Sequence, residues 1–225
     1  MIYIMQNKEA IFPVYRNYKP LKIGALYDGK YEDNIEHLNP YLNEYTGMYI
    51  MWKHMNDSII GLSHYRRFFV NNGYFLQWYE AEFWLQYYDI ITTYDYIVCD
   101  GIYKNLYNEI GTERDKKALE KYCEILFRAE PGLRDWFKHS LGFNPRNMFV
   151  CRKALIDKYF EWIFPLIIPL TERFVKEDLD NVDNIRIPAY IAERCFGYWL
   201  RKKNNLSIKR MDYFQTDQVW EDWHE

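Results

Sequence analysis

The chain has 225 residues, which suits a single domain able to bury about 70% of the surface that its unfolded form exposes. Its formal net charge of −3 excludes a general nucleic-acid binder, which would carry a strong basic excess. The chain is rich in Tyr (22), Phe (14) and Trp (8); such rings suit sugars and nucleobases, but we expect most of them in the core.

Two short strands are predicted near the start of the chain. Residues 2–5 and 21–26 are apolar runs of strand length. Lys8 lies in the polar loop that follows the first run. Asp33 and Asn34 are typical of a helix-entry turn, because both side chains readily hydrogen-bond to nearby backbone.

One helix is predicted over residues 39–55. Asn39 can cap its start, and Pro40 then falls at the first helical position, where its missing N–H costs little. The apolar residues alternate in spacing between four and three and so form one buried stripe: Tyr41, Tyr45, Met48, Trp52 and Met55. Glu44 lies off this stripe, where it can accept a proton, pair with an arginine or face solvent.

A short buried strand follows this helix and ends in a cluster of polar side chains. Residues 58–63 are mostly apolar and contain a glycine, as expected of a central strand covered on both faces. His64, Tyr65, Arg66 and Arg67 come directly after it. The strand therefore delivers two guanidinium groups and one imidazole to the same end of the sheet.

This cationic strand end predicts an anionic ligand. Buried guanidinium groups need an anionic partner, because they are costly to desolvate. In open α/β sheets, ligands bind beyond the carboxyl ends of the strands, and arginine matches phosphate oxygens bidentately. One interpretation is a site for a phosphorylated small molecule. The other is a structural ion-pair cluster that uses some of the 32 acidic residues.

The following strands bear on the use of a metal ion. Strands are predicted at residues 89–92 and 96–99. Asp95 and Asp100 flank the second strand without forming the spaced D-x-D pair with which many nucleotide-sugar transferases hold a divalent metal. Fixed cationic side chains can neutralise a diphosphate instead. The sequence favours this metal-independent chemistry, although the His64 imidazole could also ligate a metal.

Helical patterns dominate the middle of the chain. Residues 78–88 form an aromatic helical pattern. Thr112 opens a helix with a capping-box sequence that ends near Glu130, and Pro131 starts another helix. These helices are expected to pack beside the sheet rather than within it.

A turn, a strand and a long helical pattern come next. Asn147 lies at the entrance to a strand predicted at residues 148–151, as a ligand contact or as a turn-closing amide. The helical pattern over residues 153–174 contains Pro165 and Pro169, which predict a kink or a break.

The last part of the chain predicts a loop, a helix and a strand. Residues 176–187 form a polar loop and a candidate lid. Pro188 opens a helix that carries Glu193 and Arg194 beside its apolar stripe. Residues 207–210 are predicted to return as an edge strand, and the two tryptophans of the tail to dock on the body.

The location of the protein is predicted from what the chain lacks. No run approaches about 18 apolar residues, and the first residues lack the apolar core of a signal peptide. The four cysteines form no C-x-x-C pair and read as free thiols in a reducing compartment. We therefore expect a cytoplasmic protein.

Several of these residues form an ordered set that resembles a bacterial domain family of formally unknown function. The set comprises DNI at 33–35, NP at 39–40, NE at 43–44, Thr46, WK at 52–53 and GLSHYRR at 61–67. Weaker matches are RNMF at 146–149 and AER at 192–194. The family occurs among capsule, exopolysaccharide and lipopolysaccharide biosynthesis proteins and is usually described as glycosyltransferase-like.

The resemblance implies a single-domain α/β fold over residues 1–225, GT-A-like and Rossmann-related, with a mixed sheet flanked by helices. It implies a glycosyltransferase that moves a sugar from a nucleotide-diphosphate donor, UDP-hexose first and UDP-galactofuranose as a further candidate, to a bacterial surface polysaccharide. Residues 106–143 would form the acceptor side. A lipid-linked acceptor would place the protein at the inner face of the cytoplasmic membrane.

The resemblance also implies roles for individual residues. The nucleotide-diphosphate site would comprise His64, Tyr65, Arg66, Arg67, Asp33, Asn34 and Lys8. Asn147 and Arg194 would contact the donor sugar, and no metal ligand is expected. Glu193 is the first choice for the catalytic base and Glu44 the second. The alternative is a non-catalytic module that binds a nucleotide sugar or glycan, which needs the arginines but no base.

Overall fold

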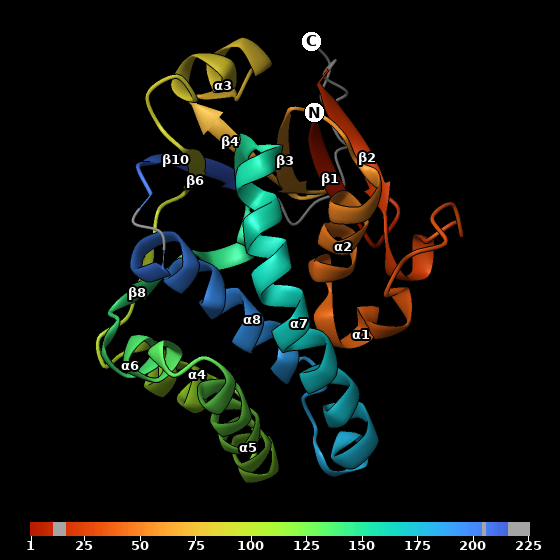
Figure 1. Cartoon of the computed structure of the whole chain (residues 1–225), viewed down its shortest axis with the longest axis vertical. Helices are drawn as coiled ribbons and strands as arrows, with labels where there is room; N and C mark the ends of the chain where they lie inside the picture. The colour runs from red at the N-terminus through yellow and green to blue at the C-terminus, as the bar shows by residue number, and fades with distance from the viewer. Residues whose placement is uncertain (11–16, 204–205, 216–225) are drawn as a thin grey trace.

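A computed structural model describes residues 1–10, 17–203 and 206–215 of the chain (Figure 1). The strands are β1 (Ile2–Gln6), β2 (Tyr18–Lys22), β3 (Ile59–His64), β4 (Arg67–Asn71), β5 (Tyr74–Phe75), β6 (Ile90–Thr93), β7 (Tyr96–Ile97), β8 (Gly142–Phe143), β9 (Phe149–Arg152) and β10 (Ile208–Gln215). The helices are α1 (Asn39–Leu42), α2 (Glu44–His54), α3 (Trp78–Trp84), α4 (Ile102–Glu109), α5 (Glu113–Ala129), α6 (Gly132–His139), α7 (Lys153–Glu177) and α8 (Ile187–Tyr198).

The central element is an eight-stranded mixed sheet in the order β2-β1-β3-β9-β6-β10-β4-β5. Strand β1 pairs in parallel with β2 and β3, and β10 pairs in parallel with β6. Strand β9 lies antiparallel between β3 and β6, and β10 is antiparallel to β4. The predicted fold class, a mixed α/β sheet flanked by helices, is confirmed.

The carboxyl ends of β1, β3, β6 and β10 lie at one edge of this sheet. Strands β3 and β6 are both antiparallel to β9 and therefore run in the same direction. The segment that leads into β9 reaches the same edge, because β9 runs the opposite way. The carboxyl end of β2 and the start of β4 also reach this edge, so side chains at five strand ends and two strand starts converge there, where α/β sheets bind ligands.

The predicted single helix over residues 39–55 is wrong at one position. Asn43 adopts φ 49° and ψ −121° and separates α1 from α2. Asn39 does not cap the helix, since its own backbone is helical and its Nδ2 donates to Thr46 Oγ1 at 2.8 Å. Pro40 lies in the first turn of α1, as predicted. The break makes Glu44 the first residue of α2.

The predicted break at Pro165 and Pro169 is absent, because α7 continues through both residues to Glu177. The alternative, a kink at these residues, stays a prediction. Each proline removes one backbone hydrogen bond within the helix. The helix packs against α2, α5, α8 and β9, and its inward face is buried. Tertiary packing, rather than local propensity, therefore maintains this helix.

Two predictions for the end of the chain have different outcomes. Strand β10, expected over residues 207–210 as an edge strand, instead lies inside the sheet, between β6 and β4. Its partners come from distant parts of the sequence, so periodicity alone did not show this position. Trp220 and Trp223, predicted to dock on the body, lie outside the described residues.

The other elements lie close to their predicted positions, with two shifts. Strand β2 lies over residues 18–22 rather than 21–26, since residues 24–26 form a 3-10 turn. Helix α3 ends at Trp84 instead of residue 88. The capping box at Thr112 is present, with its N–H and side chain both bonded to Asp115.

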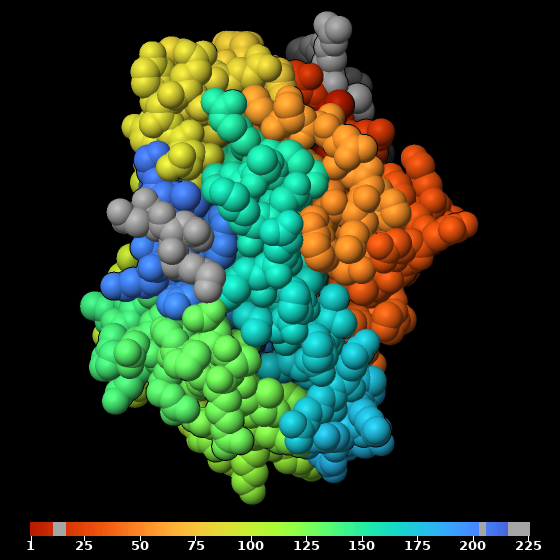
Figure 2. Space-filling model, in the orientation of Figure 1, coloured from red at the N-terminus to blue at the C-terminus, as the bar shows by residue number. Residues whose placement is uncertain are grey.

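Helix α7 crosses one face of the sheet, and α4, α5 and α6 gather at one end of the molecule, away from β1 and β2 (Figure 1). Figure 2 shows that α7 and α2 form a continuous surface on this face. Most aromatic residues are buried or half-buried, as predicted, and the fully buried ones include Tyr45, Tyr122, Tyr159, Phe149 and Trp199. Among the described residues, no helix combines the length and the apolarity needed to cross a bilayer.

Candidate active site

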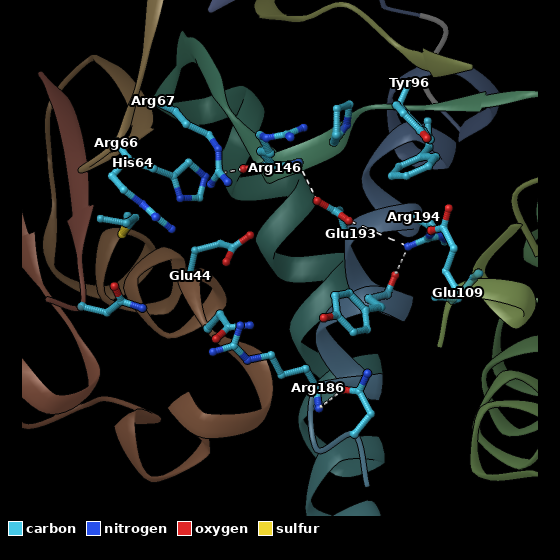
Figure 3. A pocket seen from close by; sticks show the side chains of 18 of the residues that line it. Glu44, His64, Arg66, Arg67, Tyr96, Glu109, Arg146, Arg186, Glu193 and Arg194 are labelled. Carbon is cyan, nitrogen blue, oxygen red and sulfur yellow. Dashed lines mark hydrogen bonds and ion pairs between the residues drawn. The ribbon is translucent and has the colours of Figure 1, made fainter. Parts of the chain in front are cut away.

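A cavity of about 530 Å³ opens at the edge of the sheet where the strand ends converge (Figure 3). Loops after β1, β3 and β6, the turn before β9, and helices α4 and α8 contribute to its lining. Five arginines line it, namely Arg66, Arg67, Arg146, Arg186 and Arg194. Three carboxylates, Glu44, Glu109 and Glu193, lie among them.

The His-Tyr-Arg-Arg sequence forms a tight hairpin turn at the mouth of the cavity. His64 ends β3, residues 65 and 66 form the turn, and Arg67 begins β4 and pairs with His64. Ser63 Oγ donates to the Arg67 carbonyl at 2.7 Å and closes the turn. The turn, rather than an open strand end, therefore presents both arginines to the cavity.

Arg146 is held from two sides in a left-handed backbone conformation. Its φ is 69°, a value that is uncommon for residues other than glycine. Its N–H donates to Glu193 Oε1 at 2.5 Å. Its carbonyl accepts a hydrogen bond from His64 Nε2 at 2.6 Å. The two contacts fix the backbone on both sides of the Arg146 Cα, and the Arg146 side chain lines the cavity (Figure 3).

His64 is neutral in this arrangement. Burial, together with the nearby Arg67 guanidinium, lowers its pKa from 6.5 to about 3. Because the Arg146 carbonyl can only accept, the ring proton must lie on Nε2. His64 therefore supports Arg146 without adding a charge to the site.

The guanidinium groups of Arg66, Arg67 and Arg146 lie close enough to repel one another. Burial, and then the charges of Arg146 and Arg66, lower the pKa of Arg67. Arg67 Nε donates to Gln215 Oε1 at 3.0 Å, which orients the group without neutralising it. Arg146 lies 5.1 Å from the ring centre of Tyr213. An anion bound between these side chains would relieve their repulsion.

Glu44 is held by a chain of buried polar groups. Its Oε1 accepts from Asn147 Nδ2 at 2.9 Å, while Tyr45 donates to Asn147 Oδ1 at 3.1 Å. The Tyr45 and Tyr159 hydroxyls lie 2.9 Å apart. Desolvation raises the pKa of Glu44, and the hydrogen bond from Asn147 and the charges of Arg67 and Arg186 oppose this rise. The carboxylate points into the cavity (Figure 3).

Glu193 and Arg194 are neighbours on α8 and differ in orientation. Desolvation raises the pKa of Glu193, against the opposing charge of Arg194, whose Nη1 lies 3.8 Å from Glu193 Oε2. The buried Arg194 guanidinium donates to the Tyr190 carbonyl at 3.0 Å and lies 4.4 Å from the Phe143 ring centre. Arg194 therefore forms an ion pair with Glu193 and packs on the ring of Phe143, which lines the cavity.

The structure brings most of the predicted site residues together. The predicted residues that line the cavity are His64, Tyr65, Arg66, Arg67, Glu44, Glu193 and Arg194. Asn147 is buried behind Glu44 and acts on that carboxylate rather than on the cavity itself.

Three predicted residues lie away from the cavity lining. Asn34 accepts from the Glu36 N–H at 2.9 Å and so forms the alternative helix-entry turn. Asp33 accepts from the Tyr49 hydroxyl at 2.9 Å. Lys8 is exposed beyond β1, and its neighbour Asn7 lines the cavity instead.

Sequence reasoning assigned no role to several lining residues: Arg146, Arg186, Tyr96, Glu109 and Tyr190. Arg146 had one usable signal, its place in an Asn-Pro-Arg-Asn turn directly before a buried strand. Arg186 lies in the turn before α8, the others lie in helices or in a two-residue strand, and none has a distinguishing local pattern.

The carboxylate that follows β6 is already paired. Asp95 forms ion pairs with Arg201 and Arg210. Over the described residues, no three His, Cys, Asp or Glu side chains gather in a group that could hold a metal ion. The cavity thus offers fixed cations where a spaced pair of aspartates would offer metal ligands.

The fold and the site together define a class, a mixed α/β domain with a cavity at the carboxyl ends of its strands. A solved structure described as the apo form of the bifunctional glycosyltransferase WbbM has this fold, with a TM-score of 0.76 and 23% sequence identity. The match covers 96% of this chain and 45% of that one, so the chain spans less than half of its structural relative.

The particular family is shown by sequence. The chain belongs to the family described as Domain of unknown function (DUF4422), whose profile matches residues 1–205. None of the curated proteins matches the chain at a significant level. The predicted membership of a family of unknown function is confirmed, and its link to polysaccharide biosynthesis stays a prediction.

Replacing His64 with Gln tests the neutral histidine. Gln keeps an N–H donor for the Arg146 carbonyl but is not protonated between pH 7 and pH 5. The pKa of His64 is about 3 in the folded protein and 6.5 in the unfolded chain. Below pH 6.5 the unfolded chain therefore binds more protons, and the stability of the wild type falls on acidification. His64 should lower the free energy of unfolding by up to about 1.4 kcal/mol per pH unit on acidification, and this loss should be absent in His64→Gln. Urea unfolding near pH 7 and pH 5 measures the difference.

The exposed His139 provides a matched control, because His139→Gln removes a histidine without touching the cavity. This variant should retain the wild-type pH dependence. Equal pH dependence in wild type and His64→Gln would contradict a buried neutral His64.

Proposed function

We propose that this chain is a GT-A-type glycosyltransferase that moves a sugar from a nucleotide-diphosphate donor to a glycan acceptor. The observation that carries the proposal is one cavity in which three crowded guanidiniums, Arg66, Arg67 and Arg146, lie beside two desolvated carboxylates, Glu44 and Glu193. The cations suit a diphosphate leaving group, and a carboxylate of raised pKa suits a general base. The fold shared with a solved glycosyltransferase supports the same function.

The diphosphate would lie against the hairpin turn and the Arg146 side chain. As the bond between the anomeric carbon and the phosphate oxygen breaks, negative charge develops on the diphosphate. Guanidiniums already in place stabilise that charge without reorganisation. The nucleoside would extend toward Met5, Asn7 and Ile23, at the ends of β1 and β2.

Glu44 is the better placed of the two candidate bases, which reverses the order expected from sequence. Glu193 Oε1 already accepts a hydrogen bond from the Arg146 N–H at 2.5 Å, so this carboxylate stabilises the backbone of Arg146. Glu44 is oriented by Asn147 and points into the cavity (Figure 3). In the proposed step, Glu44 takes the proton of an acceptor hydroxyl, whose oxygen bonds to the anomeric carbon as the nucleoside diphosphate leaves.

The proposed donor is a UDP-hexose, with UDP-galactofuranose as a further candidate, and the proposed acceptor is a bacterial surface polysaccharide. The family resemblance supports these identities. A cytoplasmic enzyme would reach a lipid-linked acceptor by peripheral contact with the membrane. Residues 106–143 supply the cavity wall opposite the arginines and remain the proposed acceptor side.

Removing single guanidiniums should weaken UDP binding. Arg67→Ala and Arg146→Gly are the two variants, the latter because glycine tolerates the positive φ at this position. Each loses a charge-assisted contact worth about 1.5–3 kcal/mol, so affinity measured by calorimetry should fall roughly 10- to 100-fold. Arg114→Ala, at the exposed start of α5, should bind UDP like wild type. Wild-type affinity in both site variants would refute the diphosphate site.

Two glutamine variants separate the base from the structural carboxylate. Glu44→Gln should lower kcat by about 10²- to 10⁴-fold with UDP affinity retained. Glu193→Gln keeps an oxygen for the Arg146 N–H and should stay within about tenfold of wild type. Because the pKa of Glu44 is raised, the acid limb of the rate profile should lie above pH 4.5 and vanish in Glu44→Gln.

A larger fall of kcat in Glu193→Gln than in Glu44→Gln would make Glu193 the base. Turnover in neither variant nor wild type, over a panel of UDP- and GDP-sugars that bind, would leave a non-catalytic binding module as the function.

Chelation tests the proposed use of fixed cations. Addition of EDTA should leave transfer from UDP-sugar largely intact, because Arg66, Arg67 and Arg146 supply the positive charge at the diphosphate. Donor consumption is measured with and without EDTA, followed by manganese. Complete loss of activity that manganese restores would overturn metal-independent chemistry.

A further inference from the structure

The ribbon of β7 and β8 and the residues beside it carry exposed apolar side chains, and one of these side chains lines the cavity. Four of them are strongly exposed: Tyr94 (56%), Tyr96 (50%), Ile97 (70%) and Leu141 (55%). Tyr96 also lines the cavity. Exposed apolar groups gathered beside a polar cavity are typical of a binding surface.

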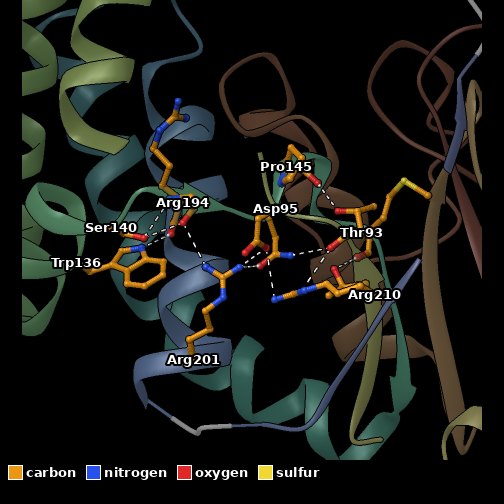
Figure 4. A network of polar contacts seen from close by, with 12 residues as sticks. Thr93, Asp95, Trp136, Ser140, Pro145, Arg194, Arg201 and Arg210 are labelled. Atoms are coloured by element: carbon orange, nitrogen blue, oxygen red, sulfur yellow. Dashed lines mark hydrogen bonds and ion pairs between the residues drawn. The ribbon is translucent and has the colours of Figure 1, made fainter. Parts of the chain in front are cut away.

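Ion pairs fix the ribbon to the body of the protein (Figure 4). Asp95, directly before β7, pairs with Arg201 and with Arg210, whose Nη2 lies 3.4 Å away. Arg201 also donates to the Gly142 carbonyl of β8 at 3.2 Å and to Asn144 Oδ1 at 3.1 Å. Both strands of the ribbon are therefore anchored to the segments after α8, and the rim is preorganised.

Packing presents one side of the Tyr96 ring to the cavity. The ring meets Phe143 edge-on, with centroids 5.8 Å apart and an interplanar angle of 68°. The Arg194 guanidinium lies 4.4 Å from the Phe143 ring centre. Phe143 is thus held between the two side chains, while half of the Tyr96 side chain stays accessible.

Tyr96 lies across the cavity from Arg66 and Arg67, which form its cationic wall. Figure 3 shows it above Arg194 and Glu109, on the side opposite His64 and Arg66. Glu109 lines the same side and is exposed. This side combines an aromatic face, a carboxylate and the Arg194 guanidinium, whereas Arg66 and Arg67 lie on the other side (Figure 3).

We infer that this rim is the acceptor subsite and that it binds a pyranose ring of the acceptor glycan; the inference rests on the proposed function. A pyranose has one face of C–H groups and a perimeter of hydroxyls. Its C–H face matches the exposed face of Tyr96, and its hydroxyls can donate to Glu109. Both candidate bases line the same cavity, Glu44 nearer to Arg66 and Arg67 and Glu193 nearer to Tyr96 (Figure 3).

A nucleobase is the competing occupant of an aromatic face, and the position of Tyr96 disfavours it. The base belongs near the end of β1, beyond the arginines that take the diphosphate. Tyr96 lies at the end of β6, across the carboxylates from those arginines. Loss of Tyr96 should therefore spare donor binding.

Saturation-transfer NMR on the full chain with UDP present tests the subsite directly. The probes are methyl pyranosides of galactose, glucose, mannose and rhamnose. The variants are Tyr96→Ala and Tyr96→Phe, and the control is Tyr79→Ala, an exposed tyrosine on α3 outside the cavity. Stacking on one aromatic ring contributes about 1–1.5 kcal/mol, so Tyr96→Ala should weaken glycoside binding roughly tenfold.

The expected result is saturation transfer from the protein to at least one pyranoside in wild type, Tyr96→Phe and Tyr79→Ala. In Tyr96→Ala this saturation transfer should be lost while the UDP affinity is unchanged. Equal transfer in Tyr96→Ala, no transfer in UDP-bound wild type, or weaker UDP binding in Tyr96→Ala would each overturn the acceptor subsite. Absence of UDP binding by wild type would instead refute the proposed function, so the two failures are distinct.

Discussion

The site depends on the backbone of one residue, Arg146, whose N–H and carbonyl are both hydrogen-bonded to side chains. Its N–H is held by Glu193 from α8, and its carbonyl by neutral His64 from the end of β3. A left-handed arginine costs of order 1–3 kcal/mol and persists only where its surroundings determine it. These two hydrogen bonds tie three distant segments together and add a third guanidinium to the pair in the hairpin turn.

Local features of the fold were predictable, and features decided by distant partners were not. The apolar run of β3 and the Thr112 capping box are determined by adjacent residues, whereas the hairpin turn after β3 was not predicted. The position of β10 inside the sheet depends on β6 and β4, which precede it by more than a hundred residues. Likewise, α7 continues through two prolines because its buried face outweighs two missing hydrogen bonds.

The same distinction holds for the site. Arg66, Arg67, Glu44 and Glu193 were predicted because charge at a strand end, or beside an apolar stripe, is visible in sequence. The roles of Glu193 and Asn147 were not, since each acts on another residue, Glu193 on the Arg146 backbone and Asn147 on Glu44. Which of two acids holds the structure and which faces the ligand is a matter of three-dimensional partners.

One of the arginines proposed to bind the donor diphosphate, Arg67, also acts on the pKa of Glu44. The charges of Arg67 and Arg186 lower the pKa of this carboxyl, against the larger effect of desolvation. In the proposed reaction, a bound diphosphate neutralises guanidinium charge beside Glu44 and adds negative charge of its own. Both changes weaken the lowering effect, so Glu44 becomes a stronger base once the donor is in place. In the proposed reaction, the cationic wall therefore couples donor binding to activation of the acceptor hydroxyl.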